Sequence, residues 1–191
     1  SSIISGAILD NVEKQGIVLD NAITDEDMGA KLENLGRALP ELLEEHTLWV
    51  ATAGRSGRQL DLSGYDLRDV LDIRRFPFTA IHAVGANFLS QDLREAQLQS
   101  AIFDRADFRD CKMNEADLRG STFKYAHFSR ADLSHAKLSA LVFKNPDGTK
   151  RKQRVDISGS SMRYANLRYA DLRDCVMMGV DLTNAVLTGC D

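Results

Sequence analysis

The chain has little of what marks several large classes of protein. It contains three cysteines and three prolines among 191 residues, so neither a disulfide framework nor a proline-rich segment is expected. No apolar run approaches the roughly 20 residues that a membrane-spanning helix needs. The N-terminus lacks the basic and then apolar order of a signal peptide. These absences predict a soluble, cytoplasmic protein with reduced thiols and no membrane partner. The chain begins at Ser1 without methionine, so both a processed product and a fragment of a longer protein stay open.

The sequence also lacks a large charge of one sign. Its 24 basic and 28 acidic residues give a formal net charge of −4 and are interspersed along the chain. No global field would therefore draw the protein onto nucleic acid or an anionic membrane. Direct nucleic-acid binding is not expected, and it would need a local basic patch.

What the sequence has instead is a period of five residues, which must be sought before any helix or strand is assigned. Triplets of a small, a polar and a large residue recur in phase from residue 71 to residue 143, and again from 155 to 187. One extra residue separates this array from two earlier triplets that start at Leu60 and Tyr65. A period of five fits neither the 3.6 residues of a helix turn nor the alternation of a strand. Typical triplets are Ala86-Asn87-Phe88, Ala106-Asp107-Phe108, Ala116-Asp117-Leu118 and Ala170-Asp171-Leu172.

This pattern resembles the A(D/N)Lxx signature of the pentapeptide-repeat family over roughly residues 60 to 187. The resemblance implies an all-β solenoid, a right-handed quadrilateral β-helix in which each repeat forms one side and four repeats form a coil. It also implies that the large residue and the small residue two positions before it point inward. A bacterial protein that presents surfaces rather than catalyses is the corresponding expectation.

Residues twenty apart in such a solenoid stack directly, because adjacent coils lie about 4.8 Å apart. The cysteines Cys111, Cys175 and Cys190 fall at the small inward position, where packing is their expected role. Two aromatic ladders are predicted in the core. One contains Phe88, Phe108 and Phe128, and the other contains Phe103, Phe123 and Phe143.

The N-terminal part breaks the period. Residues 1–24 show a faint form of the repeat phase, which predicts an N-terminal coil or capping strand. Residues 25–57 predict a short α-helical insertion or cap that begins at Thr24 or Asp25. Pro40 either ends this helix or opens a second one. The apolar residues at helical spacing are Met28, Leu32, Leu35, Leu39, Leu42 and Leu43.

The repeat β-helix then occupies residues 58–191, interrupted by a loop at 144–154. The motif Asn-Pro-Asp-Gly in this loop is a strong turn signal, and the loop has more basic than acidic residues. Loops that project from rigid scaffolds often carry function. The loop is therefore a candidate for partner binding, and a solvated excursion without a partner is the alternative. The candidate residues are Lys150, Arg151, Lys152 and Arg154.

A second candidate surface is an apolar face of the solenoid. The stacking of residues twenty apart places His82, Ile102 and Val142 in one column, with Val84 beside it. An apolar stripe of this kind can be an interface, or it can be covered by the helical segment. Covering is the favoured interpretation.

No enzymatic site is predicted, because the sequence lacks HExxH, CxxC, P-loop and GxSxG motifs. No cofactor or metal is expected either. Aspartates recur once per repeat, so pairs of carboxylates follow from the periodicity. The function expected is a non-catalytic scaffold that binds another protein. The alternative, by resemblance to the quinolone-resistance branch of the family, is a DNA mimic that regulates DNA gyrase or topoisomerase IV. At the C-terminus a homodimer through the last coil and a truncated end are both open.

Overall fold

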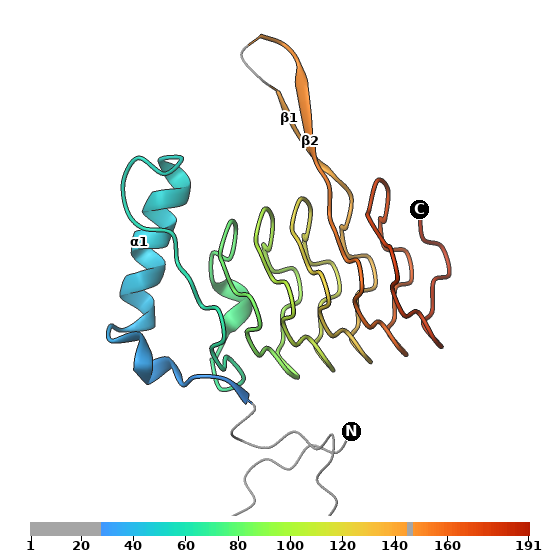
Figure 1. The fold of residues 1–191 in the computed structure, drawn as a ribbon, viewed down its shortest axis with the longest axis horizontal. Coiled ribbons are helices and arrows are strands. Elements are labelled where there is room, and N and C mark those ends of the chain that lie inside the picture. Colours follow the sequence, from blue (N-terminus) through green and yellow to red (C-terminus); the bar gives the residue numbers. More distant parts are fainter. Residues whose placement is uncertain (1–27, 145–146) are drawn as a thin grey trace, which may run out of the picture.

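The computed structural model describes residues 28–144 and 147–191. Most of them form a row of stacked coils that runs from helix α1 to the C-terminal end of the drawn chain (Figure 1). The predicted N-terminal coil or strand at residues 1–24, and the helix start at Thr24 or Asp25, lie outside the described residues. No helix in the described part of the chain is long and apolar enough to cross a membrane.

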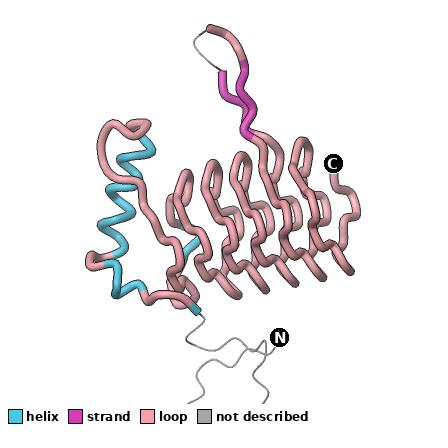
Figure 2. Tube along the Cα trace, viewed as in Figure 1, coloured by secondary structure: helices cyan, strands magenta, loops and turns pink. Residues whose placement is uncertain are grey.

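Adjacent coils are joined by parallel pairs of residues twenty apart. Ile102 pairs with Thr122, and Asp107 pairs with His127. The amide of Phe103 donates to the carbonyl oxygen of Thr122 at 2.8 Å. Each side of a coil contributes one short pairing of this kind, and Figure 2 therefore draws the coils almost wholly as loop. The result is the β-helix-like solenoid that the family resemblance implies.

The inward large residues fill the centre of the coils. The rings of Phe88 and Phe108 stack with centroids 4.8 Å apart, and those of Phe108 and Phe128 with centroids 5.1 Å apart. The rings of Phe103 and Phe123 form a second stack, with centroids 5.2 Å apart. All five rings are fully buried. Burial of a ring of this size contributes about 1.5–3 kcal/mol before the loss of side-chain entropy.

The first coils contain one extra residue, as the sequence predicts. Asp61 pairs with His82 and Asp66 with Asn87, an interval one longer than in later coils. The extra residue lies near the 3-10 helix η3 (Ile73–Arg75). Ile73 is buried there, but Leu71 is 86% exposed. Leu71 therefore does not occupy the inward position that the triplet pattern assigned to it.

The segment before Pro40 is not the continuous helix that the sequence predicts. Ala30 pairs in parallel with Tyr65, and its amide donates to Gly64 O at 2.8 Å. A short 3-10 helix η2 (Leu32–Leu35) follows and ends at Gly36 in the left-handed conformation. Residue 30 thus continues the stack of coils, which is incompatible with a helix through the same residues.

Helix α1 (Leu39–Ala51) begins with Pro40 in its first turn, in agreement with the second of the two roles predicted for this proline. The helix stands at the N-terminal end of the row of coils (Figure 1). Leu43 and His46 are its buried residues. His46 Nε2 lies 2.9 Å from Thr79 O, and the amide of Leu60 donates to His46 Nδ1 at 3.1 Å. The imidazole therefore joins α1 to two segments of the first coil.

The interruption of the array is a β-hairpin rather than a loop. Strands β1 (Leu141–Lys144) and β2 (Lys150–Gln153) pair antiparallel, and the hairpin projects from the solenoid (Figure 2). The interruption begins three residues before the predicted boundary, and Phe143 lies in β1 with 37% of its surface exposed. Its predicted place above Phe123 is taken by Ile157, because Thr122 pairs with Asp156. The placing of Phe143 in the core ladder was wrong.

Candidate functional site

The hairpin leaves the solenoid at one corner of the coil. At most corners of the coils one residue adopts a left-handed backbone conformation, and along this corner these residues are Ala80, Ser100, Gly120 and Asp174. Ala140 ends the preceding repeat at the equivalent position, and the chain then enters β1. Gly120 and Asp174 therefore belong to the two coils on either side of the hairpin root.

One side of the root rests on Gly120. Gln153 Nε2 donates to Gly120 O at 2.6 Å. A Cβ atom on Gly120 would lie 2.9 Å from Leu141 Cδ1, which is closer than carbon atoms approach without displacement. The absence of a side chain at residue 120 allows the first pair of hairpin residues, Leu141 and Gln153, to pack onto the coil.

The other side of the root is held by Asp174. Lys152 Nζ lies 2.7 Å from Asp174 Oδ2, and Arg154 Nε donates to Asp174 O at 2.7 Å. The hydrogen bond and charge of Lys152 lower the pKa of the Asp174 carboxyl below its ordinary value. Contacts with two different coils thus fix the direction in which the hairpin projects.

The pairing register assigns the hairpin residues to two faces, because side chains opposite each other share a face and alternate along a strand. Phe143 pairs with Arg151, and the Arg151 Cζ atom lies 5.0 Å from the centre of the Phe143 ring. This distance is that of a cation–π contact. The second face contains Val142 and three lysines. Its members are Val142, Lys144, Lys150 and Lys152.

On this second face Lys144 and Lys150 lie directly opposite each other. Both side chains are exposed. Within residues 28–144 and 147–191, neither has an acidic partner. The two acidic groups nearest along the chain or at the root are already engaged. Asp147 accepts hydrogen bonds from the amide and the hydroxyl of Thr149, and Asp174 binds Lys152.

The hairpin also concentrates positive charge. Residues 141–154 contain five basic residues and one acidic residue, whereas the rest of the chain has 19 basic and 27 acidic residues. A net charge of +4 in this segment therefore stands against −8 elsewhere. The hairpin segment is thus positively charged, whereas the rest of the protein is negatively charged.

The four basic residues predicted from the sequence have different roles in the structure. Lys152 and Arg154 hold the root, and Arg151 lies against Phe143. Of the four, only Lys150 has no side-chain partner among the described residues. Lys144 was not among the predicted binding residues, and neither were Gly120 and Asp174 at the root. Gly120 and Asp174 could have been found by counting repeats across the interruption. The count places Gly120 one coil before Ala140 and Asp174 one coil after it.

The predicted apolar face is only partly assembled. His82 pairs with Ile102, and Ile102 pairs with Thr122. Val142 lies in the hairpin instead, and its predicted place in the column is taken by Asp156. Val84 is 38% exposed, so α1 does not cover it fully. The His46 side chain of α1 makes its hydrogen bonds with Thr79 and Leu60 instead. The favoured interpretation of a covered face does not hold at Val84.

Five of the repeat aspartates are neutralised by an arginine of their own repeat. Asp107 Oδ2 lies 2.5 Å from Arg109 Nη2, and four other aspartates form a similar pair with the arginine two residues later. Hydrogen bonds from Arg94 lower the pKa of Asp92 to about 2. Such carboxylates are poor general bases because their lone pairs are occupied. The pairs are Asp66 with Arg68, Asp92 with Arg94, Asp107 with Arg109, Asp117 with Arg119, and Asp171 with Arg173.

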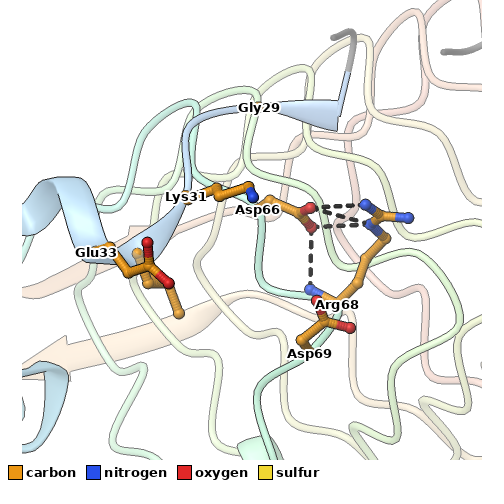
Figure 3. Close-up of a pocket in the computed structure, with 7 residues that line it drawn as sticks. Gly29, Lys31, Glu33, Asp66, Arg68 and Asp69 are labelled. Atoms are coloured by element: carbon orange, nitrogen blue, oxygen red, sulfur yellow. Dashed lines mark hydrogen bonds and ion pairs between the residues drawn. The ribbon is translucent and has the colours of Figure 1, made fainter. Parts of the chain in front are cut away.

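A hollow of about 450 Å³ near the N-terminal end of the array illustrates this neutralisation (Figure 3). Both oxygens of the Asp66 carboxylate accept hydrogen bonds from the Arg68 side chain, and Oδ1 also accepts from the Arg68 amide. The carboxylate therefore has little capacity left for a ligand. The lining residues are Gly29, Lys31, Leu32, Glu33, Asp66, Arg68 and Asp69.

The thiols and metal-binding side chains of the described residues do not form a reactive centre. Burial raises the pKa of the Cys175 thiol to about 12 and also raises that of Cys111, which disfavours the nucleophilic thiolate. Throughout the described ranges, no three His, Cys, Asp or Glu side chains come together in a way that could hold a metal ion.

Comparison with known proteins identifies the family of the chain. The pentapeptide-repeats family model matches in eight copies, at residues 78–110, 101–139 and 154–191. No curated protein matches the chain. The solved structures similar to it include the following three, with TM-scores of 0.30 or less.

HetL, a pentapeptide repeat protein involved in heterocyst differentiation regulation from the cyanobacterium Nostoc sp., is 23% identical with a TM-score of 0.25, over 60% of this chain and 54% of HetL. A pentapeptide repeat protein from the Arabidopsis thaliana thylakoid lumen is 23% identical with a TM-score of 0.23, over 56% of this chain and 58% of that one. The chain thus spans less than two thirds of the length of either protein.

QnrB1, a plasmid-mediated fluoroquinolone resistance protein, is 15% identical with a TM-score of 0.30, over 60% of this chain and 85% of QnrB1. TM-scores of this size carry no argument about function. The family matches, by contrast, extend over more than half of the chain and fall on the coils before and after the hairpin. The chain belongs to the pentapeptide-repeat family.

Proposed function

We propose that this protein is a non-catalytic scaffold that binds a partner protein through the β1–β2 hairpin. The observation that carries the proposal is the hairpin itself, which is fixed at its root by Gly120 and Asp174 and presents unpaired charge at its far end. A rigid scaffold with a projecting segment is a common way to position binding residues. We further propose that the coils are right-handed and four-sided, and that α1 belongs to a short insertion near the N-terminus.

The absence of catalysis in this proposal is supported by the chemistry of the faces. Five of the aspartates that recur along the solenoid are engaged by arginines of the same repeat. The Cys111 thiol is buried, and its Sγ donates to Phe88 O at 2.9 Å. Neither group is placed to act on a substrate.

The alternative function, mimicry of DNA toward DNA gyrase or topoisomerase IV, has less support. A mimic needs an extended array of free negative charge that imitates phosphates. Here arginine neutralises five of the repeat aspartates locally, as in Asp107, whose two carboxylate oxygens accept hydrogen bonds from Arg109 Nε. A gyrase supercoiling assay separates the two functions, since the scaffold proposal predicts no effect of the protein on supercoiling.

The proposed function can be tested by photo-crosslinking in the source cell. A benzoylphenylalanine in place of Phe143 would probe the hairpin, and one in place of Leu71, which is 86% exposed on the solenoid, is the control. We expect a discrete protein adduct from residue 143 and none from residue 71. Untagged intact protein should compete for the adduct, and a variant that lacks residues 141–154 should not.

Two outcomes count against the proposal. Equal adducts from residues 143 and 71 would indicate random collisions. Competition by the hairpin-deleted variant as strong as that by the intact protein would place the binding surface elsewhere on the molecule.

A further inference from the structure

We infer that the lysine face of the hairpin, defined by Val142, Lys144 and Lys150, binds an acidic segment of a partner protein. This inference rests on the proposed function and specifies its chemistry. The lysine face lies on the other side of the hairpin from the Phe143–Arg151 contact, beyond the root.

The first argument is the like-charge pair. Lys144 and Lys150 are direct cross-strand neighbours, and like charges in this position destabilise an antiparallel pair. The other cations of the hairpin have acceptors or an aromatic ring: Lys152 has the Asp174 carboxylate and Arg151 the Phe143 ring. The two lysines therefore carry unbalanced charge that an acidic ligand would neutralise.

The second argument is the apolar residue beside the two ammonium groups. Val142 is 50% exposed and lies on the same face. Its opposite residue, Lys152, is drawn toward Asp174 at the root. The face thus offers a small apolar surface and then two cations in sequence, which suits a segment in which acidic and aliphatic side chains alternate.

The third argument concerns which kind of anion fits. Nucleic-acid binding proteins usually neutralise many phosphates at once, whereas here two cations are free and the remainder of the chain has a net charge of −8. A long polyanion that reached the hairpin would be repelled by the solenoid. A short acidic protein segment makes contact only with the hairpin and avoids this repulsion.

A second copy of the chain fits less well. If two hairpins paired edge to edge, their lysines would meet, and charged side chains on exposed strands are a common defence against such pairing. The same lysines favour an incoming strand or helix that carries carboxylates. Charge complementarity thus selects a different protein as the occupant.

The test uses the full chain and fluorescence anisotropy. The probe is a fluorescein-labelled peptide of alternating glutamate and valine residues with serine spacers, and its counterpart has glutamine at every glutamate. We expect the glutamate peptide to bind and the glutamine peptide not to bind. Binding should weaken as salt is raised, because exposed charges are screened over about 10 Å at 0.1 M.

The variant K144S/K150S should lose about tenfold in affinity for the glutamate peptide, as expected for two exposed ion pairs. The matched control is K112S/K137S, which removes the same charge from exposed lysines on two faces of the solenoid. It should bind as the intact protein does. The reversed variant K144E/K150E should instead bind a peptide with lysine at every glutamate.

Several results would overturn the inference. Glutamate and glutamine peptides could bind equally or not at all, or K112S/K137S could lose as much as K144S/K150S. A labelled DNA strand of the same charge as the peptide could bind more tightly and through Lys144 and Lys150, which would make nucleic acid the ligand. If the sedimentation coefficient of the protein alone rises with its concentration, and K144S/K150S abolishes this rise, a second copy of the chain would be the occupant.

The inference and the proposed function can fail separately. If K144S/K150S still competes for the adduct at residue 143 while the hairpin-deleted variant does not, the hairpin binds a protein by other residues and only the inference fails. If the hairpin-deleted variant competes too, the proposed function fails.

Discussion

Thr122 pairs in parallel with Asp156, across an interval fourteen residues longer than the twenty that separate Ile102 from Thr122. The extra residues are 141–154, which leave one corner of the solenoid as the hairpin and return to the same corner. The stack above and below therefore keeps its register. An insertion at a corner adds surface to the solenoid without altering its core.

Deletion of residues 141–154 should leave a folded solenoid. It joins Ala140 to Val155 and restores the spacing of twenty between Thr122 and Asp156. We expect an unchanged circular-dichroism spectrum and cooperative unfolding in urea. Deletion of residues 121–134, also fourteen in number, is the control, because it removes the fully buried Phe123 and Phe128 from the core. The prediction fails if the two deletions behave alike.

Phe123→Ala should destabilise the protein by about 3–5 kcal/mol, because it removes a fully buried ring and leaves a cavity. Phe143→Ala should change the free energy of unfolding by less than about 1 kcal/mol, because that ring lies on the hairpin and is 37% exposed. Urea denaturation of both variants measures the difference. Equal losses of unfolding free energy in the two variants would indicate that Phe143 is buried in the core.

Gly120→Ala should loosen the root of the hairpin. The backbone at Gly120 has φ of +71°, and an added Cβ would meet Leu141. Gly179 has φ of +66° with nothing within 4 Å of an added Cβ, so Gly179→Ala measures the backbone strain alone. We expect Gly120→Ala to lower the free energy of unfolding by about 1 kcal/mol more than the control does. The same loss in both variants would mean that Leu141 moves aside freely.

Asp174→Asn should speed tryptic cleavage within residues 150–154. The change removes the carboxylate that binds Lys152 at 2.7 Å, so the root opens more often. Asp181→Asn is the control, because it breaks a comparable exposed pair with Arg163 on the solenoid. Mass spectrometry of the digest identifies the cleaved bonds. An unchanged cleavage rate in Asp174→Asn would show that the Lys152 ion pair does not secure the hairpin, and that its root rests on Gly120 and on the bond from Arg154 to the carbonyl oxygen of residue 174.

Stability should fall as the pH is lowered from about 7.5 to about 5 because of His46. Burial lowers the pKa of this imidazole, so the unfolded chain takes up a proton before the folded one does. The stabilisation is therefore complete above the unfolded pKa of about 6.5 and is lost as the pH falls toward the folded pKa. Protonation would also remove Nδ1 as the acceptor of the Leu60 amide.

The measurement for His46 is the urea midpoint as a function of pH. His46→Gln should lack most of the slope between these pH values, whereas His127→Gln, at an exposed histidine, should retain it. The interpretation is wrong if the slope persists in His46→Gln.

Much of the solenoid could be predicted from the residues alone. The inward positions of Phe88, Phe108 and Phe128 follow from the period of five together with the resemblance to the repeat family, which implies that the large residue of each triplet faces the core. The extra residue near Ile73 is also visible as a shift of phase. The repeat can be recognised locally, because five consecutive residues form each side of the coil.

The hairpin could not be predicted in the same way. Leu141-Val142-Phe143 continues the triplet pattern, yet these residues form β1 and Val155 returns to the core. The sequence places a turn signal near Asp147, but the pairing of Lys144 with Lys150 depends on where the chain rejoins the stack. The role of Gly120 depends on a contact with residues that lie far along the chain.

The sequence by itself thus determined the repeat, the core positions and the presence of a basic interruption, because each of these depends on neighbours within a few residues. Only the tertiary structure decided which cations are free. Lys152 is neutralised by Asp174 one coil further on, whereas Lys144 and Lys150 lie beyond the reach of any described carboxylate that is not already bound. Charge balance at a surface is set by distances between coils, and such distances exist only once the chain has folded.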